Sequence, residues 1–88
     1  MALTYAQGYA QALADLGDEF AELADQAQRE MNGAIQQSRD ARDLKDRRGD
    51  ERASNALSEA LRLKIGWMKA LQVCTAAERR HHRTQHAA

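Results

Sequence analysis

The chain contains no proline and one cysteine, and aromatic residues make up only 5% of its 88 residues. Without proline, nothing in the sequence forces a long helix to break. A single cysteine cannot form an internal disulfide, which excludes a small disulfide-stapled scaffold. The N-terminal stretch lacks the pattern of a signal peptide, and no apolar run approaches the roughly 20 residues that span a bilayer. We therefore predict a cytoplasmic protein without a membrane-spanning segment.

Large apolar residues are also scarce, since Leu, Ile, Val and Phe together number 13. Such a low content is typical of disordered chains when it comes with a large net charge, but here 13 basic residues balance 13 acidic ones. Alanine alone contributes 18 residues. The composition therefore predicts an all-α fold with a thin, alanine-rich core, and it excludes α/β enzymes and β-sandwiches.

The first predicted helix has a clear start and a clear apolar periodicity. Thr4 and Gln7 fit a capping box, in which each side chain bonds the backbone amide of the other residue. From there, apolar residues recur at alternating steps of three and four, at Ala6, Tyr9, Leu13, Leu16, Phe20, Leu23 and Ala27. This spacing predicts a contact line for a partner helix. The same frame turns polar further on, at Glu30, Ala34, Gln37, Ala41 and Leu44.

A second line of residues runs beside that apolar line and consists of small side chains: Ala10, Ala14, Gly17, Ala21 and Ala24. Small residues let a neighbouring helix come close. The alternative interpretation is that alanine is simply a good helix former.

Glycine positions predict where the helices end. Gly49 follows a basic turn and precedes Asp50, a good N-cap residue, so we predict one helix over about residues 4–47 and a second over about 51–79. Asn32-Gly33 is the site of an alternative break, which would give three helices. Residues 1–80 then form a single helical-hairpin domain.

The second predicted helix has a wide apolar face. Leu57, Leu61, Met68 and Leu71 lie at its centre, and its flanks carry Ala56, Ala60, Leu63, Ile65, Trp67 and Cys74. One partner helix covers only a narrow line, so a lone hairpin cannot bury this face together with that of the first helix. We therefore expect a homodimer that forms a four-helix bundle, which resembles the plasmid-copy-control hairpin dimers in architecture alone.

The charges are neutral overall but separated along the chain. Residues 1–28 carry a net charge of −5 and residues 52–88 carry +5. The negative charges fall on one side of the first helix and form an acidic stripe: Asp15, Asp18, Glu19, Glu22 and Asp25. This stripe is suited to docking on a protein with a basic surface. An ordinary solvated helix face is the alternative.

Two further groups are candidate contacts. Lys64, Ile65 and Trp67 are predicted to form an apolar rim on the second helix that also faces a protein partner. Residues 81–88 are predicted to be a flexible, basic and His-rich tail. Arg79 and Arg80 just before this tail, and Arg83 within it, would contact phosphates if the chain binds nucleic acid instead.

Catalytic motifs are missing from the sequence. The histidines all lie near the C-terminus, and Cys74 has no histidine or acid at a suggestive spacing. We predict that the protein is not an enzyme and uses no cofactor or metal. We expect a protein–protein interaction module, a small regulator or inhibitor of the phage or plasmid type that docks on a host protein. A small dimeric nucleic-acid-binding regulator is the alternative.

Overall fold

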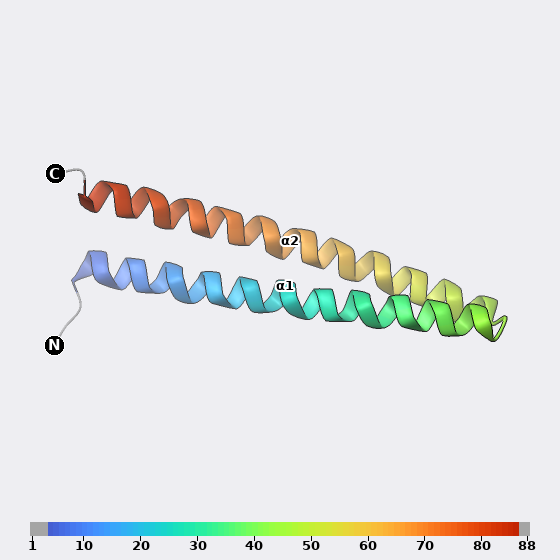
Figure 1. Ribbon diagram of the computed structural model, residues 1–88. Coiled ribbons are helices and arrows are strands. Elements are labelled where there is room, and N and C mark those ends of the chain that lie inside the picture. Colours follow the sequence, from blue (N-terminus) through green and yellow to red (C-terminus); the bar gives the residue numbers. More distant parts are fainter. Residues whose placement is uncertain (1–3, 87–88) are drawn as a thin grey trace.

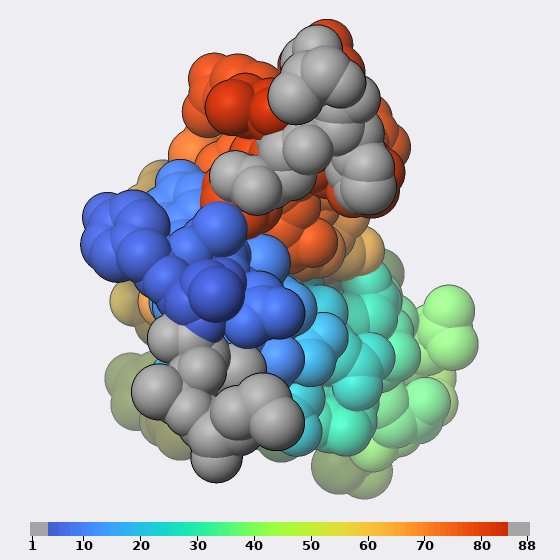
Figure 2. Space-filling model, turned by 90° about the vertical axis from the view of Figure 1, so that its left-hand side faces the viewer, coloured from blue at the N-terminus to red at the C-terminus, as the bar shows by residue number. Residues whose placement is uncertain are grey.

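The computed structural model describes residues 4–86, with side chains described as far as Thr84. The described chain forms two helices, α1 over Tyr5–Asp43 and α2 over Arg47–His86, which run antiparallel as a hairpin (Figure 1). The molecule is long and thin, with extents of 65 × 25 × 12 Å. The start of α1 and the end of α2 lie side by side at the end opposite the turn, which Figure 2 views end-on. The predicted all-α hairpin is confirmed.

Within the described residues, neither helix is long and apolar enough to cross a membrane.

The predicted capping box is present at the start of α1. The backbone amide of Gln7 donates to Thr4 Oγ1 at 3.2 Å, and the amide of Thr4 donates to Gln7 Oε1 at 3.1 Å. These two bonds satisfy amides that have no partner inside the helix. The local sequence therefore determines where α1 begins.

The alternative break at Asn32-Gly33 does not occur, because α1 continues through both residues. Gly33 is exposed, and a Cβ built on it would have no neighbour within 4 Å. Glycine weakens a helix by about 1 kcal/mol relative to alanine, which the packing of a 39-residue helix along α2 outweighs. The three-helix alternative is therefore wrong for this structure.

The turn lies earlier than predicted, at residues 44–46. The amide of Lys45 donates to Arg42 O at 3.0 Å, and the amide of Asp46 donates to Ala41 O at 2.7 Å. This pair of bonds is a Schellman motif, which needs a left-handed residue after the helix. Lys45 takes that conformation, with φ of 56°, although glycine is the usual residue there. We predicted the helix end from a glycine, whereas the left-handed residue that follows this helix is a lysine.

Gly49 has a different role, since it lies in the first turn of α2. Asp46, and not Asp50, takes the N-cap position, because its Oδ1 accepts from the Gly49 amide at 3.0 Å. A Cβ at Gly49 would lie 2.9 Å from Asp46 Cγ and 3.3 Å from Ala41 Cβ. Glycine is therefore required here by a close approach between the capping residue and the end of α1.

The far end of α2 also differs from the prediction, since the helix extends to His86 and not to about residue 79. Residues 81–86, predicted as part of a flexible tail, are helical, and residues 87 and 88 lie outside the described range. His81 packs against the first turns of α1, with its Nε2 3.1 Å from Ala6 O and its ring edge-on to Tyr9. These contacts give the last turns of α2 a partner that the sequence pattern did not reveal.

Small side chains line the contact between the helices. The buried residues are Gly17, Ala24, Ala27, Ala34, Ser38 and Ala41 on α1 and Ala53, Ala60 and Cys74 on α2. Phe20 and Trp67 stack between the helices nearer the free end, with ring centroids 5.8 Å apart.

The predicted contact line on α1 is therefore only half right. Ala27, Ala34 and Ala41 lie on this line and are buried. The other buried residues, Gly17, Ala24 and Ser38, each lie one residue after a position of the predicted line. The large residues predicted there are left at the surface: Tyr9 is 43% exposed, Leu16 42% and Leu44 79%. Helix α2 packs between the apolar line and the line of small residues, because the small side chains permit the closer approach.

Replacing Gly33 with alanine tests the continuity of α1. We expect the free energy of unfolding of the Gly33→Ala variant to be about 0.5–1 kcal/mol higher than that of the natural chain, because alanine favours the helix and its Cβ meets no neighbour. Urea denaturation followed by circular dichroism measures this change. Gly49→Ala is the matched control and should lose stability, because its Cβ would clash with Asp46. A destabilised Gly33→Ala variant would contradict a continuous α1.

Candidate interaction surfaces

The acidic stripe lies on the solvent side of α1, and all five of its carboxylates are exposed. Asp15 accepts a hydrogen bond from Gln11 Nε2 at 2.8 Å, and Asp25 pairs with Arg29 at 3.3 Å. Both of these contacts are within α1. The stripe is a continuous, outward-facing negative surface.

The predicted rim on α2 is not one patch. Lys64 is half-buried and its ammonium donates to the Gln28 side chain on α1. Trp67 is half-buried in the stack with Phe20. Ile65 lies on another side of the helix and is 47% exposed. The structure therefore separates these three residues, and it gives Lys64 and Trp67 contacts within the hairpin.

One flank of the hairpin, which we call the Leu16 face, is apolar over the half nearest the free end. The face is formed by residues that recur every seven positions on each helix, beside the residues that contact the other helix. They are Tyr9, Leu16 and Leu23 on α1 and Leu63, Ala70 and Ala77 on α2. Leu63 is 50% exposed, and Leu23, Ala70 and Ala77 are partly covered. None of the six is charged. Sequence reasoning missed this face because it assigned Tyr9, Leu16 and Leu23 to the contact with the second helix.

The opposite flank, which we call the Met68 face, is more polar. Leu61 and Met68 are 43% and 42% exposed on α2, beside Ala21 on α1. The Gln28–Lys64 hydrogen bond crosses this face, and an open groove of about 320 Å³ is lined partly by these two residues and Met68. Polar groups therefore interrupt the apolar surface on this side.

The arginines predicted to contact nucleic acid all lie on α2, including Arg83, which was predicted to lie in the flexible tail. Arg79, Arg80 and Arg83 are exposed on α2. Helical spacing places Arg80 and Arg83 on the side of α2 that faces away from α1, together with Arg62 and Lys69. The outer surface of α2 is therefore basic, whereas that of α1 is acidic.

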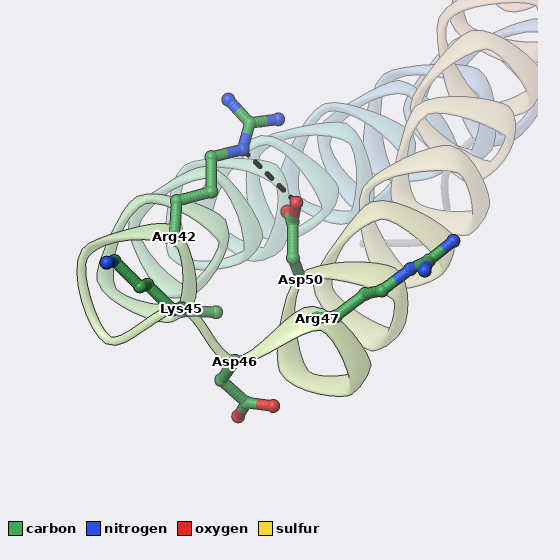
Figure 3. A pocket seen from close by; sticks show the side chains of 6 residues that line it. Arg42, Lys45, Asp46, Arg47 and Asp50 are labelled. Atoms are coloured by element: carbon green, nitrogen blue, oxygen red, sulfur yellow. Dashed lines mark hydrogen bonds and ion pairs between the residues drawn. The ribbon is translucent and has the colours of Figure 1, made fainter.

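A shallow groove of about 270 Å³ lies at the turn, lined by Ala41, Arg42, Lys45, Asp46, Arg47 and Asp50 (Figure 3). Asp50 accepts hydrogen bonds from the Ser38 hydroxyl and from Arg42 Nε, the latter at 3.2 Å. The Ser38 bond and then Arg42 hold the pKa of Asp50 below its usual value of 3.8. Asp50 thus joins the start of α2 to the end of α1, which is a structural role.

Cys74 also serves packing. The residue is 4% exposed, and its thiol donates to Leu13 O at 3.0 Å. Burial raises the pKa of this thiol, and the nearby Glu78 carboxylate raises it further. Because the thiolate is the nucleophilic form, a raised pKa makes Cys74 a poor nucleophile. Among the side chains described, no group of three or more His, Cys, Asp or Glu residues is placed to hold a metal ion.

Comparison with protein-family models, with curated proteins and with solved structures finds no match to this chain.

The contact at Asp50 predicts a specific loss of stability in acid. A carboxyl group whose pKa is lowered by folding stabilises the fold above its unfolded pKa and loses that contribution as the pH falls through the folded value. We expect Asp50→Asn to unfold at lower urea concentration at neutral pH and to lose less stability on acidification to about pH 3. Glu59→Gln, which removes an exposed carboxylate from α2, is the control. Equal acid sensitivity of Asp50→Asn and the natural chain would contradict this role.

Proposed function

We propose that the chain is a non-catalytic protein–protein interaction module. The observation that supports this most directly is the surplus of exposed apolar side chains. None of the large side chains described is fully buried, and Leu16, Leu61, Leu63, Ile65 and Met68 are each at least 42% exposed. Exposed apolar surface on this scale, on a thin hairpin, is typical of proteins that bind another chain.

We further propose that the module is a homodimer and that it binds its target through the acidic stripe. The five carboxylates present charge without competing contacts from α2, so a basic protein surface would be attracted to them. In this proposal the protein is a cytoplasmic regulator or inhibitor, of the kind that phages and plasmids direct against host proteins. The structural roles of Asp50 and Cys74 support a binding function over a catalytic one.

Charge reversal in the stripe tests target binding. We expect Asp18→Lys combined with Glu22→Lys to reduce capture of the target from host extract about tenfold or more, equivalent to ~1.4 kcal/mol. Quantitative mass spectrometry of affinity-captured proteins measures this loss, and the circular dichroism spectrum should remain unchanged.

The control carries Asp40→Lys with Asp43→Lys, which changes the net charge equally at exposed positions outside the stripe. Capture by the stripe variant at the level of the natural chain would contradict target binding through the stripe.

The basic outer surface of α2 favours a second candidate function, nucleic-acid binding. If this is the function, Arg80→Gln with Arg83→Gln should weaken the retardation of a short DNA or RNA in a gel, and added salt should weaken it further. The matched control is Arg29→Gln plus Arg39→Gln, which makes the same charge change at exposed positions on α1. The absence of any gel shift with the natural chain would remove this candidate.

A further inference from the structure

The Leu16 face is the most apolar unpartnered surface among the described residues, and it occupies only the half of the hairpin near the free end. Tyr9, Leu16 and Leu23 provide a row of large side chains on α1. On α2 the same face offers Leu63 followed by the small residues Ala70 and Ala77. Further toward the turn the face becomes polar, since the equivalent α1 positions are Glu30 and Gln37. A partner that covers the Leu16 face must therefore bind to the half of the hairpin opposite the turn.

We propose that a second copy of this chain covers the Leu16 face, with α1 of each copy lying over α2 of the other. This inference rests on the proposed dimer and adds the surface and the arrangement. The two-fold axis runs parallel to the helices, so both turns lie at the same end of the dimer. All neighbouring helices of the resulting bundle are antiparallel.

Two-fold symmetry allows only two arrangements of hairpins that pack through one flank. If the axis is parallel to the helices, α1 lies over α2 of the second copy. If the axis is perpendicular to them, α1 lies over α1 of the second copy, and the turns point in opposite directions. The choice between these arrangements depends on the shape and the charge of the two helices.

Shape favours the parallel axis. In that arrangement the large row of Tyr9, Leu16 and Leu23 lies over a helix that offers alanines at positions 70 and 77. Large side chains opposite small ones fill the space between two helices. The perpendicular axis would instead place the large side chains of α1 against the same side chains of α1 in the second copy. It would also leave the alanines of α2 opposite each other.

Charge favours the same arrangement. The stacking of Phe20 on Trp67 shows that the acidic part of α1 lies level with the basic half of α2. With a parallel axis, α1 of one copy is aligned with α2 of the second copy in the same way. The −5 charge of residues 1–28 then lies beside the +5 charge of residues 52–88 of the second copy. A perpendicular axis through the apolar patch would bring the two acidic stripes together, and their like charges would repel.

Light scattering and a substitution on the face test the surface. We expect the natural chain to have a mass of about 20 kDa, twice its 9.8 kDa, and Leu16→Lys or Leu63→Lys to reduce it to that of a monomer with the helical signal retained. Ile65→Lys, which charges a similarly exposed residue outside the face, should remain a dimer. A natural chain that is a monomer, or a dimer that Leu61→Lys dissociates and Leu16→Lys does not, would overturn the proposal.

Electron spin resonance tests the arrangement. A spin label on Leu44→Cys, in a Cys74→Ala background, reports the distance between the two turns. We expect less than about 30 Å, because helix axes in a bundle lie about 8–10 Å apart. A perpendicular axis near Leu16 would separate the turns by roughly 80 Å at a rise of 1.5 Å per residue and would overturn the arrangement. Added salt should weaken the proposed dimer, whereas it would strengthen one with like charges in contact.

These measurements separate the arrangement from target binding. A monomeric natural chain that still captures its target through the acidic stripe overturns the dimer alone. A dimer of the expected geometry whose capture is insensitive to Asp18→Lys and Glu22→Lys supports the arrangement and contradicts the acidic stripe as the binding surface.

Discussion

The close approach of α1 and α2 along a line of small side chains is the constraint on which the rest of this structure depends. At Gly17 an added Cβ would lie at ordinary contact distance, 3.6 Å from Cys74 Sγ, so the gap between the helices there is no wider than an alanine side chain would fill. Nearer the turn, alanines occupy the equivalent positions on both helices. Burial of alanine removes little apolar area from water, and the gain is only about 25 cal/mol per Å². The hairpin therefore gains contact along its whole length while it leaves its largest apolar residues partly exposed.

The fold class, the start of α1 and half of the contact positions on α1 could be predicted from the sequence. The phase of the contact on α1 could not, because two adjacent lines on this helix satisfy the same periodicity. One line contains Tyr9 and Leu16 and has the stronger apolar signal; the other contains Gly17 and Ala24 and permits the closer approach. Periodicity measures hydrophobicity alone, whereas the depth to which two helices pack depends on side-chain size. The Leu16 face was missed for this reason.

The turn was misplaced because its determinants are tertiary. Lys45 adopts a left-handed conformation that is unfavourable for lysine by about 1–2 kcal/mol, and no local preference predicts it. The Schellman bonds to Arg42 O and Ala41 O satisfy backbone groups there, and Asp50 links the two helices just beyond the turn. Gly49 is needed because Ala41 and Asp46 come close to it, which becomes visible only once the chain has reversed. A glycine near a predicted helix end thus indicates either a cap or a close contact, and the sequence does not distinguish them.

The surface of α1 divides into sectors that do not compete with one another. One sector, through Gly17 and Ala24, contacts α2. A second sector carries Leu16, and in the proposed dimer it contacts another copy of the chain. Asp15 and Glu22 lie on the side away from both, as helical spacing requires. Self-association through the Leu16 face would therefore leave these carboxylates accessible, and it would display two acidic stripes on one particle. Two linked copies of a weak electrostatic site bind a target with matching sites far more tightly than one copy does. The same separation of sectors would allow a chain with so little apolar material to combine the proposed dimer with the proposed charged binding surface.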